Sequence, residues 1–561
     1  MPTPAVGSPV TTGTTASSAA TTDYVVLRER GASRAAALAA IKAAGGRIVK
    51  ENRALGTVTV TAPANGFIAA VSKSDAVVGA ARNRIIGRSP QAKAQAKVLK
   101  RAMEIEREHH YAVGYGGART SSAGATAAST AGMDPLDRKL WGLRMVRSDL
   151  ARTKNAGDRR VKVGILDTGI DRRNPDIAPN FSARLSRNFA PDIPEFDGPC
   201  EFRGCLDPAG WDDGGHGTHV AGTVGAAANG FGISGVAPNI TLVNIRGGQD
   251  SGYFFLGPVT DALTYGGDAG LDVINMSFFV DPWLYNCRNN PADTPEQQAE
   301  QRTIIAAMNR ALTYAHDKGV TLVGALGNNH EDLGNPRTDV GSPNPGIPHE
   351  RPIDNESCFD LPVEGPYVLG ITALGPSGVK SDYSNYGTEQ ADFSAPGGFY
   401  RDYFGTDLFK TNENLILSSY PFNALRAEGL VDDRGNITPL GAELGTLKRC
   451  PAGVTDFRQC GYYTYLQGTS MAAPHASGVA ALVVSQHGSV GTRGYGLNPG
   501  RVRRILAATA ADRACPEPRT VDYLDEGRDE EYTATCRGSR DVNGFYGEGI
   551  VDAWRAVTYR G

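Results

Sequence analysis

Short runs of consecutive apolar residues recur through most of the chain, separated by segments with helical spacing. They include VKVGILDTG, ITLVNIR, DVINMSFF, VTLVGALGN and YVLGITAL. Because several neighbouring positions in each run are apolar, both faces of the expected strand must be buried. That is typical of a parallel sheet covered by helices on both sides. The pattern therefore predicts an α/β domain over residues 134–561.

A different pattern fills residues 23–88. A strand-like segment at 24–31 is followed by an alanine-rich helical segment at 32–46 and by two strands around a turn at 47–63. Residues 65–87 then supply a second helix and a last strand. The order β-α-β-β-α-β is that of a ferredoxin-like unit, so we expect a small, separate α+β domain.

Two segments rich in small residues flank this unit. Residues 1–22 contain mostly Thr, Ser, Ala and Pro, too few large apolar side chains to form a core, so we expect a disordered tail. Residues 89–133 change from a charged, helix-favouring stretch to a Gly/Ser/Ala/Thr run. This composition predicts a linker that is open to proteolysis.

Composition limits the classes of function. A chain of 561 residues with 40% hydrophobic residues is expected to form at least two folded units. Its formal net charge of -3 argues against binding to nucleic acid or to an anionic membrane surface. No apolar run reaches the ~20 residues of a membrane span. We expect no nucleic-acid or membrane partner, and a monomer.

Eight cysteines, none in a CxxC motif, suggest local disulfides and an oxidising compartment. A zinc site is the weaker alternative, because the cysteine spacings and the nearby histidines do not suit it. Sequence alone cannot fix connectivity, but the provisional pairs are Cys200–Cys205, Cys287–Cys358, Cys450–Cys460 and Cys515–Cys536. The chain is therefore expected to be secreted. Its first residues do not resemble a signal peptide, so we expect that segment to be missing from the given sequence.

Four polar residues stand where an α/β domain carries function. Asp167 and Asn328 follow apolar runs, His216 opens HGTHVAGTVGA, and Ser470 lies in GTSMAAPH. In such domains the loops at the carboxyl ends of parallel strands form the functional site. Each residue alone could instead cap a turn or a helix. Their joint presence favours one site.

These segments resemble the subtilisin family of serine peptidases, the subtilases. DTGID, GHGTHVAG, GVAPN, NMS, GALGNN, YSNYG, SAPG and GTSMAAPH occur in the family's order over residues 134–561. The resemblance implies an α/β, three-layer domain with a mostly parallel sheet. It also implies a serine endopeptidase whose partners are protein or peptide substrates.

Residue by residue, the resemblance makes Ser470 the nucleophile, His216 the general base and Asp167 the carboxylate that orients His216. A serine hydroxyl needs such a base to attack an amide, and the base needs a carboxylate to hold its tautomer. Asn328 matches the side-chain donor to the oxyanion. His219 has no catalytic position and is expected to be structural.

The N-terminal unit resembles the inhibitor-type propeptide of this family in its placement and its pattern. The resemblance implies an intramolecular inhibitor, a zymogen, and cleavage within residues 89–133. The bond itself cannot be located from the sequence.

A structural calcium ion is also implied. Asp176 and Asn229 match side-chain ligands of the family's strong site, and backbone carbonyls are expected from Ala227, Phe231 and Ile233. Calcium favours such mixed oxygen ligands. The alternative is that Asp176 and Asn229 only cap turns. Asp134 is a weaker candidate for a further ligand.

Two strands are expected to line the substrate cleft, and both depart from the family. Bulky residues replace small ones after NMS, and Leu326 stands where alanine is common, so a narrower cleft and a more selective enzyme are expected. The expected cleft residues are Ser277, Phe278, Phe279, Ala325, Leu326 and Gly327.

Asp360 lands at the base of the expected S1 pocket. A carboxylate there would favour Arg or Lys at P1. The equally weighted alternative is that Asp360 points to solvent beside Cys358.

Residues 398–467 form an insertion where relatives have a short connection, and we expect it to be ordered as a lid or a primed-side exosite. Two alternatives stay open for the function. The first is a dedicated processing peptidase for one precursor. The second, an inactive pseudoprotease, is disfavoured because no triad residue is lost.

Overall fold

We describe a computed structural model of the chain that covers residues 20–83, 106, 134–335, 338–344, 346–492 and 494–561. The expected tail lies outside the described residues except at its end. There the first strand begins at Thr21, before the expected boundary at residue 22. The expected linker, residues 89–133, also lies outside them apart from Glu106.

The N-terminal unit has the expected ferredoxin-like order. Its antiparallel sheet has the strand order β2-β3-β1-β4, and the outer strand β4 pairs with β1. The alanine-rich helix α1 begins at a serine cap, Ser33, whose side chain accepts a bond from Ala36 N–H. The elements are β1 (Thr21–Arg28), α1 (Arg34–Ala43), β2 (Arg47–Asn52), β3 (Thr57–Pro63), α2 (Phe67–Val71) and β4 (Val77–Arg82).

The large domain is built on a seven-stranded sheet in which every described pairing is parallel. All five apolar runs quoted above pair side by side in this sheet, as β14, β10, β8, β5 and β7. Its order is β15 (Phe393–Pro396), β14 (Val368–Leu374), β10 (Thr321–Ala325), β8 (Val273–Met276), β5 (Lys162–Leu166), β7 (Thr241–Arg246) and β6 (Arg187–Asn188).

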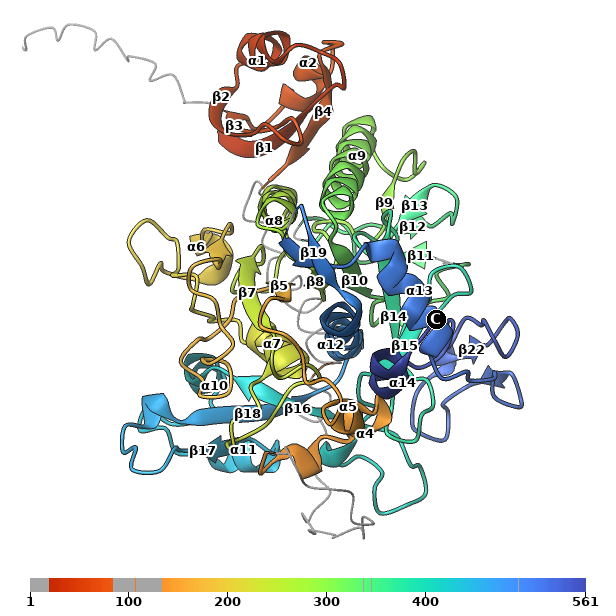
Figure 1. The fold of residues 1–561 in the computed structure, drawn as a ribbon. Coiled ribbons are helices and arrows are strands. Elements are labelled where there is room, and N and C mark those ends of the chain that lie inside the picture. The colour runs from red at the N-terminus through yellow and green to blue at the C-terminus, as the bar shows by residue number, and fades with distance from the viewer. Residues whose placement is uncertain (1–19, 84–105, 107–133, 336–337, 345, 493) are drawn as a thin grey trace, which may run out of the picture.

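Helices cover both faces of this sheet, which gives three layers (Figure 1). Side chains of one strand alternate between the two cores: Val163 packs with one layer and Leu166 with the other. One layer contains α8 (Leu256–Asp268) and α9 (Pro295–Asp317). The other contains α4 (Trp141–Met145), α5 (Ser148–Ala151), α7 (His216–Gly225), α12 (Thr469–His487), α13 (Pro499–Thr509) and α14 (Ala553–Thr558).

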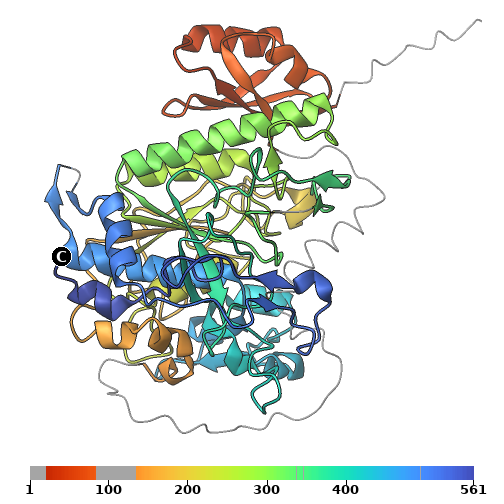
Figure 2. The same cartoon turned by 90° about the vertical axis from the view of Figure 1, so that its right-hand side faces the viewer.

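The N-terminal unit lies on α8 and α9, as both Figure 1 and Figure 2 show. Arg82 pairs with Glu296 and Glu300 of α9, at 2.5 and 3.5 Å. Asn83 Oδ1 accepts a hydrogen bond from Gly257 N–H at the start of α8. Apolar residues such as Leu27 join the core beneath these helices. The unit therefore packs on the large domain through its sheet.

The insertion at 398–467 forms a small antiparallel sheet, β16-β18-β17, at the opposite end of the molecule. It packs on α7, where Ser418 Oγ donates to the His219 carbonyl at 2.7 Å. The segment is ordered, as expected. Its elements are β16 (Ile416–Tyr420), α10 (Phe422–Ala427), α11 (Pro439–Glu443), β17 (Leu447–Arg449) and β18 (Gly461–Leu466).

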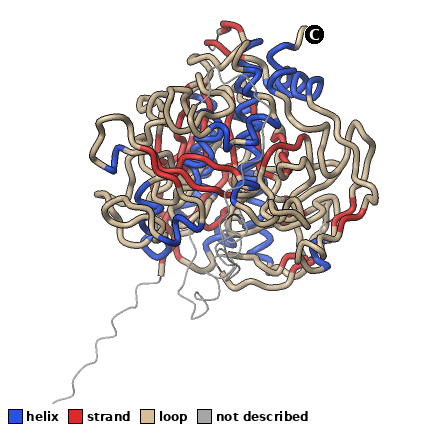
Figure 3. The backbone as a smooth tube through the Cα atoms, turned by 90° about the horizontal axis from the view of Figure 1, so that it is seen from below, coloured by secondary structure: helices blue, strands red, loops and turns tan. Residues whose placement is uncertain are grey.

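All four provisional disulfide pairs are confirmed. Loops between the central elements form much of the surface seen in Figure 3. None of the described helices combines the length and the apolar character that a membrane crossing requires. The remaining elements are short: α6 (Pro194–Asp197), β9 (Asn286–Cys287), β11 (Thr338–Asp339), β12 (Arg351–Pro352), β13 (Cys358–Phe359), β19 (Ser489–Gly491), β20 (Gly494–Gly496), β21 (Thr520–Val521), β22 (Ala534–Thr535) and four 3₁₀ turns at Asp137–Lys139, Asn412–Asn414, Phe457–Gln459 and Glu530–Tyr532.

Candidate active site

Asp167 and His216 meet at the carboxyl edge of the parallel sheet. Asp167 follows β5, and His216 is the first residue of α7. His216 Nδ1 lies 2.8 Å from Asp167 Oδ1, and Asp167 is fully buried. The next residue, Gly217, allows this approach, since a Cβ there would stand 2.2 Å from the Gly169 carbonyl oxygen. The pair can hold a neutral imidazole with its Nε2 free to accept a proton.

Ser470 is the second residue of α12 and is 5% exposed. Its Oγ makes a long 3.5 Å hydrogen bond to the Ser277 carbonyl oxygen, and Ser277 Oγ donates to the Ser470 carbonyl at 3.0 Å. The Ser470 N–H lies in the first turn of a 19-residue helix, where backbone donors lack helical partners. The helix dipole there favours a negative charge.

Asn328 is oriented by the start of the same helix. Its Oδ1 accepts hydrogen bonds from Thr469 N–H and Thr469 Oγ1, at 2.9 and 2.8 Å. The amide nitrogen of Asn328, Nδ2, is not used in these bonds. It lies 3.3 Å from the position that a Cβ on Gly468 would take. Asn328 therefore presents a donor beside the turn that precedes Ser470.

Glu106, the one residue between 84 and 133 that the structure describes, lies in this site. Its Oε1 is 3.6 Å from His216 Nε2 and 3.2 Å from a Cβ placed on Gly468. Its carbonyl oxygen accepts a 3.1 Å hydrogen bond from Gln467 N–H. His216 and the turn before Ser470 thus face one small space, and Glu106 occupies it.

The Glu106 carboxylate affects the pKa of His216. Burial lowers the pKa of the His216 imidazole, but the carboxylates of Asp167 and Glu106 raise it by more, so the pKa lies well above its ordinary value. A protonated His216 cannot act as a base. The contact therefore opposes proton abstraction while Glu106 is in place.

The residues expected to line the cleft divide between two environments. Phe278 stacks on Phe254 with ring centroids 4.0 Å apart, and Phe279 is half-buried. Leu326 is fully buried in the core on the α8 and α9 side, whereas Ala325 belongs to the opposite core. The Leu326 side chain therefore does not narrow the cleft, contrary to expectation. Gly327 has φ +103°, and a Cβ there would meet Asn385 Nδ2 at 2.4 Å.

Asp360 is 3% exposed, so the alternative that it points to solvent is wrong. Its Oδ2 lies 3.4 Å from a Cβ placed on Gly327. Its N–H donates to Glu364 Oε2 at 2.7 Å. Burial raises the pKa of Glu364 to about 7. Burial also raises the pKa of Asp360 well above its ordinary value, and the nearby Glu364 carboxylate adds to that shift. A buried carboxyl, Asp360, therefore stands beside Gly327, and the half-buried Glu364 is bonded to the Asp360 backbone.

The residues expected to hold calcium lie together. Asp176 is fully buried, and its Oδ2 accepts hydrogen bonds from Ile233 N–H and the Tyr463 hydroxyl at 2.9 and 2.7 Å. Its Oδ1 is buried and has no hydrogen-bond partner among the described residues. Burial raises the pKa of Asp176 to about 7. An unpartnered buried carboxylate oxygen fits an oxygen-seeking cation.

The loop around Asp176 is fixed by hydrogen bonds. Ala227 N–H donates to the Asp176 carbonyl, and Asn229 Oδ1 accepts from Phe231 N–H, at 2.8 and 2.9 Å. Asp134 accepts bonds from the N–H groups of Asn229 and Gly230. The expected ligands are thus adjacent, although Ile233 turns its N–H and not its carbonyl to Asp176.

Two histidines of the motifs have structural contacts. His219 Nε2 lies 3.0 Å from the Ile416 carbonyl of the insertion. His475 Nδ1 lies 2.8 Å from the Met471 carbonyl, and burial lowers the pKa of His475 to about 4. A histidine with so low a pKa stays neutral near pH 7.

Sequence reasoning missed Glu106 and Glu364. Glu364 stands four residues after Asp360 in DLPVE, a visible signal once Asp360 is considered. Glu106 carried no signal, because it is one of several charged residues in the expected linker.

Known proteins share sequence and fold with this chain. The peptidase S8 model, described as "Subtilase family", matches residues 158–549. Subtilisin DY of Bacillus licheniformis is 24% identical over 376 residues, which cover 66% of this chain and 91% of that protein.

Two crystal structures share the fold. The epidermin leader peptide processing serine protease of Staphylococcus aureus superposes with a TM-score of 0.60 at 18% identity, covering 96% of this chain and 98% of the other. Fervidolysin of Fervidobacterium pennivorans, a keratinolytic enzyme related to subtilisin, has a TM-score of 0.55 at 20% identity, covering 97% of this chain and 61% of the other.

Proposed function

The chain belongs to the subtilase family and is a serine endopeptidase, and we propose that it cleaves peptide bonds through Ser470, His216 and Asp167. The observation that carries this proposal is the 2.8 Å contact between His216 Nδ1 and Asp167, beside the helix start that bears Ser470. A fluorophosphonate probe on the mature protein tests it. Labelling at Ser470 is expected, and an unlabelled Ser470 would contradict the proposal.

In this mechanism Ser470 Oγ attacks the substrate carbonyl carbon and gives its proton to His216 Nε2. Asp167 stabilises the imidazolium, and the Ser470 N–H and Asn328 Nδ2 donate to the oxyanion. The tetrahedral intermediate collapses as His216 protonates the leaving amine, which leaves an acyl-enzyme. Water, deprotonated by His216, then hydrolyses the ester.

The protein is made as a zymogen in this proposal. The N-terminal unit is anchored on α8 and α9, and Glu106 of the linker stands against His216. Residues 23–88 would act as the inhibitor, with cleavage in the linker at 89–133 releasing the site.

Replacing Glu106 by glutamine should lower the pKa of His216 in the uncleaved chain, because it removes one of the two carboxylates that raise it. NMR titration of the histidine rings in a Ser470→Ala background measures the pKa. Glu108→Gln makes the same charge change two positions along the chain and should leave it unaltered. An equal pKa in all three chains would refute the role of Glu106.

The same contact makes activation depend on pH. Glu106 helps to raise the pKa of His216, so its contact with His216 is favoured while His216 is protonated. That advantage is lost as the pH rises through the raised pKa. Onset of activity in the parent chain should therefore be faster at higher pH, with a weaker dependence in Glu106→Gln.

A preference for basic P1 residues follows from Asp360, a buried carboxyl beside Gly327, and from the half-buried Glu364 bonded to its backbone. Neither carboxyl is bonded to a cation among the described residues. Asp360→Asn should lower the ratio of kcat/KM for Arg-P1 over Phe-P1 peptides by about 10–100-fold, because a hydrogen bond to a charged group is lost. In the parent the ratio should rise with pH through about 7, as Glu364 ionises.

Asp354→Asn serves as a control, since this exposed carboxyl lies in the same segment. An unchanged Arg/Phe ratio in Asp360→Asn would exclude Asp360 from P1 selection.

Other features complete the proposal. Four disulfides support secretion, because such bonds persist in oxidising compartments. We propose a monomer. Calcium bound by Asp176 and Asn229, with carbonyls from the loop at 227–233, would stabilise that loop.

A dedicated processing role for one precursor is the second candidate. It is supported by the phenylalanines at 278 and 279 and by the ordered insertion, whose Gln467 N–H binds the Glu106 carbonyl as a substrate backbone could be bound. Cleavage profiling on a diverse peptide library separates the two: a broad profile would favour a general peptidase.

A further inference from the structure

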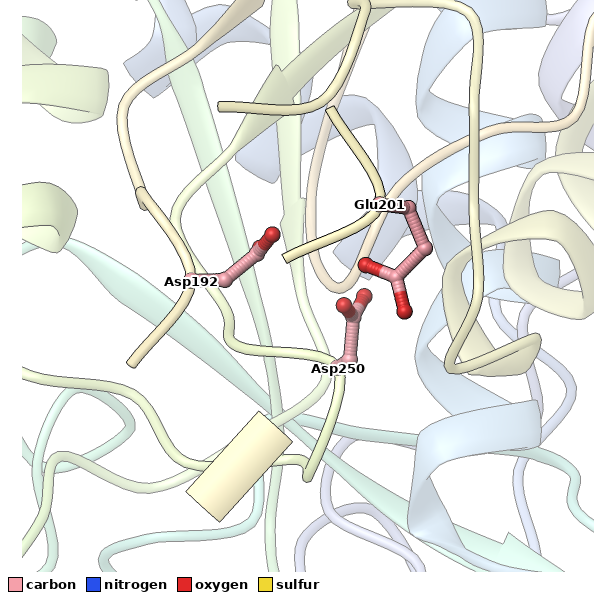
Figure 4. Close-up of side chains that lie close together, drawn as sticks. All are labelled: Asp192, Glu201 and Asp250. Atoms are coloured by element: carbon pink, nitrogen blue, oxygen red, sulfur yellow. The ribbon is translucent and has the colours of Figure 1, made fainter. Parts of the chain in front are cut away.

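A group of carboxylates stands apart from both the triad and the Asp176 loop. Asp192, Glu201 and Asp250 each place a carboxylate oxygen within 4.8 Å of the others, and in Figure 4 the three side chains point into one space. Asp192 and Glu201 lie in the segment between β6 and α7, and Asp250 lies just after β7. The sequence analysis did not single out this group.

The carboxylates of this group carry more negative charge than the one neighbouring cation, Arg246, can balance. The fully buried Arg246 guanidinium contacts Asp192, Asp207 and Asp250 at 3.4, 2.6 and 2.9 Å. Three carboxylates therefore contact one guanidinium, and Glu201 adds a fourth carboxylate close to them. Burial, with a smaller contribution from neighbouring carboxylates, raises the pKa of Asp192 to about 6. Burial also raises the pKa of Asp250 to about 8, although the Arg246 guanidinium opposes this shift.

Unpartnered oxygens give an independent sign of a missing ligand. Asp192 and Asp207 are each 2% exposed, and Asp192 Oδ2 and Asp207 Oδ1 have no hydrogen-bond partner among the described residues. An unpaired buried carboxylate oxygen is costly. Asp192 belongs to the group in Figure 4, so a cation there would lie against a buried carboxylate that has an unpartnered oxygen.

Glu201 is the exposed member, and its position is fixed covalently. It lies in the short loop closed by the Cys200–Cys205 disulfide, and the Cys205 carbonyl accepts a 2.7 Å hydrogen bond from Asp192 N–H. The disulfide loop therefore holds Glu201 close to the buried Asp192 and the half-buried Asp250. One side of the group stays open to solvent, which allows an ion to enter and water to complete its coordination.

We propose that Asp192, Glu201 and Asp250 bind a calcium ion, a site separate from Asp176. An all-oxygen, carboxylate-rich ligand set selects a hard cation over zinc. Ligands at calcium's ~2.3–2.6 Å can lie up to about 5 Å apart across the ion, whereas magnesium requires a smaller octahedron. The ion would anchor the segment that leads into His216 to the end of β7.

Terbium luminescence on the calcium-depleted Ser470→Ala chain tests this site. Trp211 can sensitise a bound lanthanide because it lies near the site. Its indole N–H donates to Asp213 at 2.5 Å, and Asp213 groups with Glu201. Saturable emission excited through tryptophan and displaced by calcium is expected. Glu201→Gln and Asp250→Asn should each weaken terbium binding by about 10–100-fold. Thermal unfolding checks that both variants fold, and calcium should raise the midpoint most in the parent.

Two control variants sharpen the assignment. Asp176→Asn should keep the signal, because it alters the other expected cation site. Glu201 also groups with Asp207 and Asp213, so Asp213→Asn should weaken binding less than Asp250→Asn. The proposal is overturned if the parent shows no saturable emission, if Glu201→Gln binds as the parent does, or if Asp213→Asn abolishes binding while Asp250→Asn does not.

Discussion

Replacing Ser470 by alanine should reduce kcat by about 10⁶-fold, the size known from subtilisin itself for loss of the triad serine. Ser470 lies at the first turn of α12, and its Oγ reaches the Ser277 carbonyl, whereas the neighbouring Thr469 hydroxyl is bonded to Asn328 Oδ1. The uncleaved chain should also persist, because maturation in the proposed zymogen depends on the same nucleophile. Peptide hydrolysis and gel analysis of the purified chain measure both effects.

Ser477→Ala is the matched control. It removes a hydroxyl from the same helix, where Ser477 Oγ donates to Asn275 Oδ1 at 2.8 Å within the core. The change should cost stability, typically about 1 kcal/mol for one such hydrogen bond, and leave kcat nearly unaltered. If Ser470→Ala still processed itself in pure form, another residue would have to be the nucleophile.

Much of the fold was predictable because the signals are local. The apolar runs that became β5, β8, β10 and β14 needed only burial on both faces, and the β-α-β-β-α-β unit followed from element order. Asp167 and His216 were predictable for a related reason: each stands directly at the end of a strand or the start of a helix. The carboxyl edge of a parallel sheet then brings such ends together.

Leu326 shows where the sequence argument failed. Ala325 and Leu326 are consecutive, and successive side chains of an extended segment point to opposite faces. Only one of them can face a given side of the sheet, and Leu326 packs into the core beneath α8 and α9. The resemblance alone placed both at the cleft, without regard to this alternation.

The acidic group around Arg246 could not be predicted from the sequence, for a different reason. Its members come from the segment before α7 and from the end of β7, two parts of the chain that lie together only in the folded domain. Glu106 is a stronger case. Nothing in the composition of its segment separates it from neighbouring charged residues, so its contact with His216 is visible only in three dimensions.

Asn328→Leu should lower kcat by about 10²–10³-fold with little change in KM, the range known from the corresponding subtilisin change. In the proposed mechanism the Nδ2 donor meets charge that develops only in the transition state, so its loss should affect the chemical step more than substrate binding. Asn328→Asp should be at least as harmful, because it keeps the acceptor that Thr469 binds but places a carboxylate near the oxyanion. Steady-state kinetics on one peptide substrate measure both.

Thr469→Val distinguishes the orientation of the Asn328 side chain by Thr469 from the hydrogen bond that Asn328 Nδ2 donates. It removes the Oγ1 bond to Asn328 Oδ1 and leaves the Thr469 N–H bond and the Nδ2 donor in place, so a smaller loss of kcat, about tenfold, is expected. In the double variant with Asn328→Leu, the threonine change should add almost nothing, because it acts through the amide already removed. Fully additive losses would mean that Thr469 acts elsewhere, for example through its bond from Gly327 N–H. A raised KM with unchanged kcat in Asn328→Leu would instead make Asn328 a ground-state binding residue.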